Sequence, residues 1–211
     1  VKHILLAIQP TREKLIRILE AQKQYPEITF STLVDNSDSL TLFSNLAETQ
    51  NQKINLWVDI NNGMNRTGVV TESASKLYMK LCNNYNINVK GIHVYDGHIR
   101  PKDLQQRIDQ CNIDFQPVRN LIAEIQNLGG EVPEQITGGS PSFYPHALNK
   151  SNRLSPGTTL LWDLGYQKIW SESPFIHAAV LAIRLISKPN TDILCFDLGH
   201  KAVACEMPLP R

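Results

Sequence analysis

The sequence has 211 residues, of which 42% are hydrophobic and 19% are charged, and its formal net charge is +1. A chain of this size can bury a substantial core, as one large domain or as one domain and part of a second. The near-neutral charge and the absence of Lys/Arg runs argue against nucleic acid or an anionic membrane as a partner, and no apolar stretch is long enough to span a bilayer. Four cysteines without C-x-x-C spacing are typical of reduced thiols, so we expect a cytoplasmic protein.

Apolar strand-like runs alternate with amphipathic helical runs over most of the chain. We expect strands at 3–8, 28–34, 54–60 and 89–94, and helices at 13–24, 37–50, 72–83 and 108–128. This alternation is typical of βα units around a parallel sheet, and the continuous apolarity of the run L-W-V-D-I predicts a sheet that is covered on both faces. A doubly wound sheet and a barrel both agree with this pattern.

The pattern changes near residue 175 to two adjacent strands, 175–187 and 192–197, joined by the turn K-P-N-T. We therefore expect residues 1–172 to form the α/β domain and residues 173–211 to begin a separate β domain. The chain starts inside one strand-like run and stops directly after another, so we also expect the natural protein to extend beyond both ends.

Polar and glycine-rich segments follow the predicted strands at one recurrent place, namely 61–66, 95–98, 137–140 and 155–158. In α/β folds, ligands bind at the carboxyl ends of the strands. Gly-Gly-Ser and Pro-Gly-Thr offer backbone N–H groups and hydroxyls to a phosphate, and Arg66 can address an anionic cofactor oxygen. Each segment alone is more often a simple turn. Together they favour a phosphorylated cofactor or substrate.

The chain resembles the D-threonine aldolase and D-serine dehydratase family in five ordered segments: D-I-N-N-G-M-N-R-T-G-V, G-I-H-V-Y-D-G-H, G-G-S-P-S-F, S-P-G-T-T-L-L-W-D-L-G-Y and D-L-G-H-K-A-V-A. These are pyridoxal 5′-phosphate (PLP) enzymes with an alanine-racemase-like barrel. The resemblance covers nearly all of the chain. It implies a (β/α)8 TIM barrel of the alanine-racemase type, represented by its last six strands, followed by the start of a C-terminal β domain.

The same resemblance implies a function. We expect a PLP-dependent, metal-assisted lyase that acts on D-β-hydroxy-α-amino acids, either by retro-aldol cleavage as in D-threonine aldolase or by β-elimination as in D-serine dehydratase. The metal would be divalent manganese, magnesium or zinc, and the protein would be a homodimer. An amino-acid racemase of the same barrel fold, a non-catalytic PLP-binding protein and a barrel that binds sugar phosphates are the alternatives.

Cofactor contacts also follow from the resemblance. Arg66 matches the arginine that reaches the phenolic oxygen of the PLP ring, and Tyr95 matches an aromatic residue that stacks on the ring, although barrel-mouth packing would otherwise explain this tyrosine. The predicted phosphate cup consists of Gly138, Gly139, Ser140, Gly157 and Thr158. Ser155 occupies the position near the ring nitrogen where alanine racemases carry arginine, which weakens the racemase interpretation.

Two parts of the family pattern are absent from the sequence. The lysine that forms the Schiff base belongs to a segment that would precede residue 1, and the metal-binding H-x-C or H-x-D motif would follow the chain, so we assign no catalytic and no metal-binding residue. Two histidines have simpler interpretations. We expect His93, inside an apolar strand, to be hydrogen-bonded in the core, and His98 to be either a solvated loop residue or an acid/base group.

Overall fold

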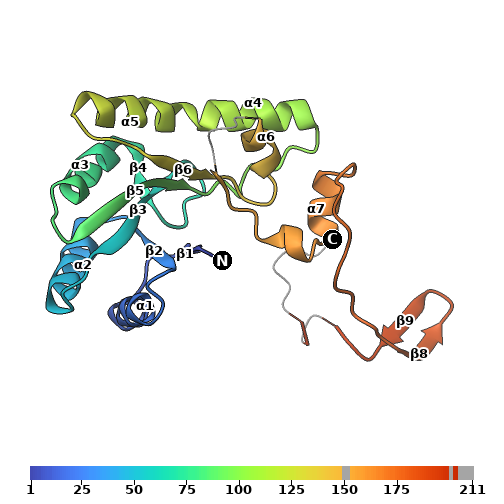
Figure 1. Ribbon diagram of the computed structural model, residues 1–211. Helices are drawn as coiled ribbons and strands as arrows, with labels where there is room; N and C mark the ends of the chain where they lie inside the picture. The colour runs from blue at the N-terminus through green and yellow to red at the C-terminus, as the bar shows by residue number, and fades with distance from the viewer. Residues whose placement is uncertain (149–152, 200–201, 204–211) are drawn as a thin grey trace. The chain divides into compact units, whose positions relative to one another are not determined.

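The structure is a computed structural model that describes residues 1–148, 153–199 and 202–203 (Figure 1). The chain forms two compact units, Val1–Gly157 and Thr158–Arg211, which are described separately. The first unit contains β1 (His3–Leu6), α1 (Arg12–Gln24), β2 (Thr29–Val34), α2 (Ser37–Thr49), β3 (Ile54–Asn61), β4 (Val69–Val70), α3 (Thr71–Cys82), β5 (Ile87–Val94), α4 (Leu104–Asp114), α5 (Gln116–Asn127), β6 (Glu134–Thr137), α6 (Phe143–Ala147) and β7 (Arg153–Leu154).

The strands of the first unit form one parallel sheet in the order β1-β2-β3-β5-β6-β7, and the short strand β4 pairs with the end of β3. Apart from the short β4, strands that follow one another along the chain are therefore neighbours in the sheet, as in a barrel wound in one direction. This order confirms the six parallel strands that were expected. Because every strand runs the same way, the loops after β3, β5 and β6 meet at one edge of the sheet.

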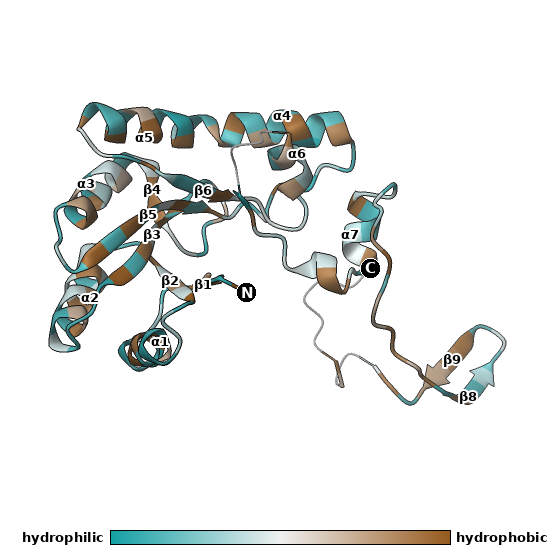
Figure 2. Cartoon of the chain, in the orientation of Figure 1, coloured by the Kyte–Doolittle hydropathy of each residue, from teal (hydrophilic) through white to brown (hydrophobic). Residues whose placement is uncertain are grey.

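The two faces of the sheet have different partners. On one face, Leu56 and Val58 of β3 pack with the apolar sides of the surrounding helices in the main hydrophobic core. On the other face, Trp57 packs with Leu33 of β2 and Ile136 of β6. Residues 54–60 are all buried, which confirms that this strand is covered on both sides. Figure 2 shows hydrophobic colour along β3 and β5 and alternating hydrophobic and hydrophilic stripes on the helices.

The expected single helix over 108–128 is wrong, because two helices, α4 and α5, occupy this region. Phe115 ends the first helix and Pro117 lies in the first turn of the second. Proline has no N–H to donate to the preceding turn and its ring crowds the carbonyl four residues earlier, so one regular helix cannot continue through this position. The first helix also begins before residue 108, where the side chain of Asp103 accepts a hydrogen bond from the N–H of Gln106 at 2.8 Å.

The second unit contains a 3-10 turn (Thr158–Leu160), α7 (Leu164–Ile169) and a hairpin of β8 (Leu185–Asn190) and β9 (Ile193–Phe196). This antiparallel hairpin confirms the start of a C-terminal β domain. The expected strand over 175–187 is wrong in its extent, because β9 has only four residues and pairs with 185–190 alone. The expected domain boundary at 172/173 stays a prediction. Residues 200, 201 and 204 of the last resembling segment lie outside the described residues.

Within the described ranges, no helix combines the length and the apolar character that crossing a membrane requires.

Candidate functional site

Arg66 and Tyr95, which the sequence assigns to one site, come together at the carboxyl ends of β3 and β5. Arg66 lies in the loop after β3, where the side chain of Asn61 shapes the turn by accepting hydrogen bonds from the N–H groups of Gly63 at 3.1 Å and Asn65 at 3.0 Å. Tyr95 is the first residue after β5. The guanidinium carbon of Arg66 lies 4.7 Å from the centroid of the Tyr95 ring, which is the distance of a cation–π contact.

The side chain of Arg66 is available to a ligand. The residue is exposed, and among the residues that the structure describes no carboxylate forms an ion pair with it. A guanidinium without an acidic partner, at the strand ends of an α/β fold, fits an anionic group such as a phenolate or a phosphate. The arginine therefore fits the contact that the sequence assigns to it.

The ring of Tyr95 is held between two glycine-containing turns. A Cβ atom placed on Gly139 would lie 2.7 Å from Cε2 of this ring, and one placed on Gly97 would lie 2.6 Å from the phenolic oxygen. These separations are shorter than any normal carbon contact, so only glycine allows the backbone to approach the ring this closely. The turn after β6 is thereby brought against the residue that follows β5.

The Gly-Gly-Ser turn differs in one respect from the expectation of bare N–H groups. The N–H of Gly138 donates to the carbonyl of Val94 at 3.1 Å. The N–H of Gly139 donates to Oγ of Ser142 at 2.9 Å and to Oδ1 of Asp96 at 3.3 Å. Both glycine N–H groups are thus used within the protein. Both glycines are buried, and a Cβ atom on Gly138 would lie 3.0 Å from Cα of Phe143. Gly138 also has a positive φ of 81°, which disfavours other residues.

The remaining predicted cup residues are Ser155, Ser140, Gly157 and Thr158. Ser155 lies beside the Gly-Gly-Ser turn, since its hydroxyl donates to the carbonyl of Gly138 at 3.0 Å, and Ser140 is buried within the turn. Gly157 is exposed at the end of the first unit, and Thr158 begins the second unit. The cofactor roles of these residues stay predictions.

A buried polar cluster behind the glycine turn was not found from the sequence. Asp96 has 0% exposure, and its Oδ2 lies 2.6 Å from Nε2 of His146 on α6. Its Oδ1 accepts hydrogen bonds from the hydroxyl of Ser142 and from the N–H of Gly139. One carboxylate therefore receives three hydrogen bonds from the segment that follows β6. The ring of Phe115 packs edge-on against His146, with ring centroids 5.2 Å apart.

Cys111 of α4 lies next to this cluster. Its sulfur, a carboxylate oxygen of Asp96 and a ring nitrogen of His146 all lie within 4.8 Å of one another. Burial, reinforced by the negative charge of Asp96, raises the pKa of the Cys111 thiol to about 12, so the thiol is protonated at neutral pH. The sequence offered only weak signals for this group, namely the aspartate after Tyr95 and a serine and a histidine after the double glycine.

The two other histidines of interest have different surroundings. His93 is buried and its Nδ1 lies 2.7 Å from Oδ1 of Asp59 on the neighbouring strand β3, which confirms the expected hydrogen-bonded core histidine. His98 is partly exposed, and its Nε2 lies 3.4 Å from a carboxylate oxygen of Asp114. A Cβ atom on Gly63 would lie 2.9 Å from the same nitrogen, so the loop after β3 packs on His98.

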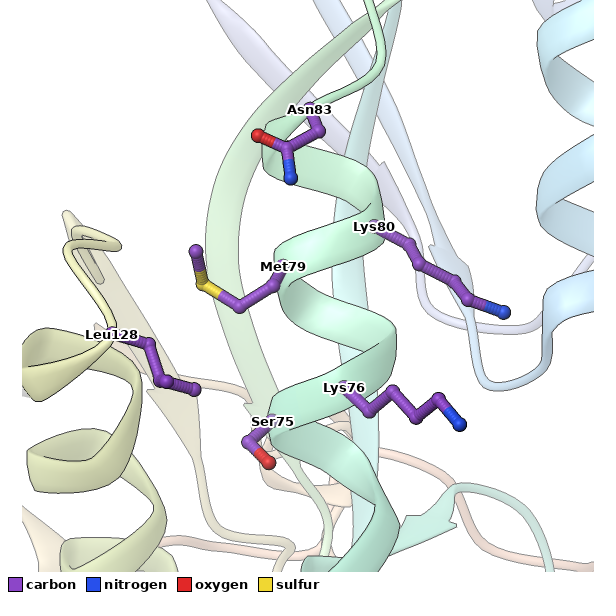
Figure 3. A pocket seen from close by; sticks show the side chains of 6 residues that line it. All are labelled: Ser75, Lys76, Met79, Lys80, Asn83 and Leu128. Carbon is purple, nitrogen blue, oxygen red and sulfur yellow. The ribbon is translucent and has the colours of Figure 1, made fainter.

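A groove of about 580 Å³ on the outer helices is separate from these residues (Figure 3). It is lined by Ser75, Lys76, Met79, Lys80, Asn83 and Leu128 of α3 and the end of α5. The Lys76 and Lys80 side chains point away from Leu128 (Figure 3). None of the residues assigned to the cofactor lines this groove, so the candidate site is the edge of the sheet that carries Arg66 and Tyr95.

Comparison with known proteins agrees with the fold and with the resemblance seen in the sequence. A 3-hydroxy-D-aspartate aldolase of Paracoccus denitrificans (strain Pd 1222) is 24% identical over 198 residues, which is 86% of this chain and 50% of the relative. The crystal structure of D-threonine aldolase from Filomicrobium marinum superposes with a TM-score of 0.84 and 22% identity, covering 98% of this chain and 56% of that chain. A D-threo-3-hydroxyaspartate dehydratase superposes with a TM-score of 0.66 and 16% identity, covering 79% of this chain and 43% of that chain.

The chain thus spans about half the length of these relatives. Their structures confirm the alanine-racemase-like barrel that was expected. The family model described as the alanine racemase N-terminal domain matches residues 11–164, which is most of the chain. This match shows that the chain belongs to the alanine racemase N-terminal domain family.

Proposed function

We propose that this chain carries the cofactor site of a PLP-dependent lyase that acts on D-β-hydroxy-α-amino acids. The reaction would be retro-aldol cleavage or elimination of water. The observation that supports this most directly is the exposed Arg66 guanidinium over Tyr95, against the glycine turn after β6. The names of the relatives support the substrate class, since they describe a 3-hydroxy-D-aspartate aldolase, a D-threonine aldolase and a D-threo-3-hydroxyaspartate dehydratase.

Each residue of the site has a distinct task in this proposal. When bound, PLP supplies the electron sink that both reactions need at the substrate Cα. Arg66 would bind the phenolic oxygen of the cofactor through charge-assisted hydrogen bonds and stabilise its ionised form. Tyr95 would pack on the face of the cofactor ring, and Ser155 would place a neutral hydroxyl at the ring nitrogen. The phosphate would bind at Gly138, Gly139, Ser140, Gly157 and Thr158.

A divalent metal, either manganese, magnesium or zinc, belongs to the proposal through the family resemblance alone. The described residues contain one group with suitable donor atoms, formed by Asp96, Cys111 and His146. This group does not fit the expected role, because all three residues are buried behind the glycine turn and the carboxylate is already hydrogen-bonded to the histidine. We therefore derive no reaction step through a metal. The homodimer and the cytoplasmic location also stay predictions.

The alternatives agree less well with the chain. A racemase is disfavoured because Ser155 stands where alanine racemases carry arginine. A single-domain PLP carrier is disfavoured by the antiparallel hairpin of β8 and β9 in the second unit. A sugar-phosphate site would not require an arginine and a tyrosine in contact.

The decisive experiment is Arg66→Leu in the full-length protein. We expect PLP affinity to fall by roughly 10- to 100-fold, as for the loss of a hydrogen bond to a charged group worth about 1.5–3 kcal/mol. Turnover of D-threonine, D-serine and 3-hydroxy-D-aspartate should fall by orders of magnitude. Far-UV circular dichroism should not change, because Arg66 is exposed.

The matched control is Arg12→Leu, which removes an exposed arginine of α1 and should leave PLP affinity as it is. Borohydride reduction followed by intact-mass measurement tests the cofactor itself. A mass increase of one pyridoxyl phosphate supports the proposal. A mass that does not increase after borohydride treatment, together with no turnover of any of the three substrates, would reject the proposed function. Unchanged PLP affinity in Arg66→Leu would reject the role of Arg66.

A further inference from the structure

We propose that Asp96 is a positioning residue that fixes the glycine turn in the shape that binds the cofactor phosphate. This inference rests on the proposed function, because it assigns a purpose to a buried carboxylate behind the predicted phosphate cup. Asp96 makes no contact with the cofactor in this proposal. It acts through Gly139 and Ser142.

The hydrogen bonds of the Asp96 carboxylate come from the segment that it would position. The donors are the N–H of Gly139, the hydroxyl of Ser142 and the ring of His146 at 2.6 Å, while Asp96 itself follows β5. A carboxylate with 0% exposure is costly to bury unless its oxygens are hydrogen-bonded. The three bonds meet this requirement and at the same time tie the turn after β6 to the end of the neighbouring strand.

One further contact and the sequence order explain why these hydrogen bonds matter for the site. Gly139 lies against the ring of Tyr95, where a Cβ atom would come within 2.7 Å of Cε2. Tyr95 and Asp96 are adjacent in sequence, so one backbone segment places the aromatic ring toward the site and the carboxylate behind it. Because the N–H of Gly139 points to Asp96 and Ser142, the outward surface of the turn is set by these buried bonds.

A buried zinc ion held by Asp96, Cys111 and His146 is the competing interpretation. The donor atoms lie within 4.8 Å of one another, and the set of a carboxylate, a thiol and an imidazole is one that zinc accepts. The geometry favours hydrogen bonding, because the imidazole nitrogen lies 2.6 Å from the carboxylate oxygen and a zinc ion would have to replace that bond. Cys111 separates the two interpretations, since it is a zinc ligand in one and a packing residue in the other.

The test compares the affinity of the full-length protein for PLP and for pyridoxal, which lacks the phosphate. Asp96→Ala should reduce the preference for PLP over pyridoxal by about tenfold or more, as expected for a turn that loses hydrogen bonds to a charged group. Asp96→Asn keeps an acceptor for the turn and should restore part of the preference. Cys111→Ala should keep the preference of the unaltered protein. Asp59→Asn alters the other buried aspartate–histidine pair and controls for a general loss of stability.

The outcomes separate this inference from the proposed function. If the unaltered protein binds PLP no better than pyridoxal, the phosphate cup and the proposed function are wrong. If it prefers PLP and Asp96→Ala retains that preference, the positioning role is wrong. One equivalent of zinc in the purified protein, lost in Cys111→Ala, would also overturn it. Should Asp96→Ala fail to fold, Ser142→Ala removes one bond to the carboxylate together with the bond from the Gly139 N–H to Oγ, and it must lower the preference for PLP.

Discussion

Replacing Gly139 by alanine tests whether close packing of the turn against Tyr95 organises the site. The added Cβ would lie 2.7 Å from Cε2 and 3.0 Å from Cζ of the ring, whereas ordinary carbon contacts are about 3.5–4.0 Å, so turn and ring must separate by about 1 Å. Gly139 does not have a positive φ, so the substitution adds no backbone strain. The bonds from its N–H to Asp96 and Ser142 restrain the turn, and the ring is the part that moves.

We expect Gly139→Ala to lower the free energy of unfolding by about 1–3 kcal/mol, the usual cost of overpacking, and to weaken PLP binding. Denaturant unfolding and PLP titration measure the two effects. Gly199→Ala is the stability control, because among the described residues, its chain neighbours aside, no atom lies within 4 Å of its added Cβ. In a Tyr95→Ala background the cost of Gly139→Ala should largely disappear. An equal cost in both backgrounds, or a cost below about 0.5 kcal/mol, would refute the reasoning.

Two more predictions concern buried ionisable groups. The Cys111 thiol has an ordinary pKa of 9.0 and a pKa of about 12 in the folded protein. At pH values between these two, the unfolded chain loses a proton that the folded chain keeps, so the free energy of unfolding falls as the pH rises. In this pH range the free energy of unfolding of the unaltered protein should fall by about 1.4 kcal/mol per pH unit relative to that of Cys111→Ala. If the unfolding free energies of the two proteins depend on pH in the same way, the thiol is not buried. Asp59→Ala leaves a buried nitrogen of His93 without its partner and should lower the free energy of unfolding by about 1–3 kcal/mol, as measured by denaturant unfolding. A loss under 1 kcal/mol would mean that this pair is not closed off from water.

The parts of the fold that could be predicted follow from short-range patterns. Alternating βα runs with nearly continuous apolar strands specify a parallel sheet, and the structure has that sheet, with six strands in chain order and the short β4 paired with β3. The periodicity did not distinguish a barrel from an open sheet, because both use the same local units. Pro117 was legible as a helix breaker, yet the apolar spacing over 108–128 continues through it and predicts a single helix.

Only those residues of the candidate site that follow a predicted strand could be placed from the sequence. Arg66 and Tyr95 could be placed from their positions after two predicted strands, and the structure brings them within 4.7 Å. The bonds of the glycine N–H groups could not be foreseen, because they depend on Asp96 and Ser142, which are 43 and 3 residues away from Gly139 along the chain. A pattern shows that a turn is rich in glycine. It does not show to which side the N–H groups point.

The chain contains two buried aspartate–histidine pairs, and their positions imply different consequences. Asp59 and His93 join β3 to β5 inside the sheet, so the loss of that bond acts on the pairing of the two strands and hence on the stability of the whole first unit. Asp96 and His146 join the end of β5 to a short helix after the glycine turn, outside the strand ladder. Its loss leaves every strand pair intact and acts on the turn. Similar chemistry therefore supports the scaffold at one place and, in our proposal, the shape of the cofactor site at the other.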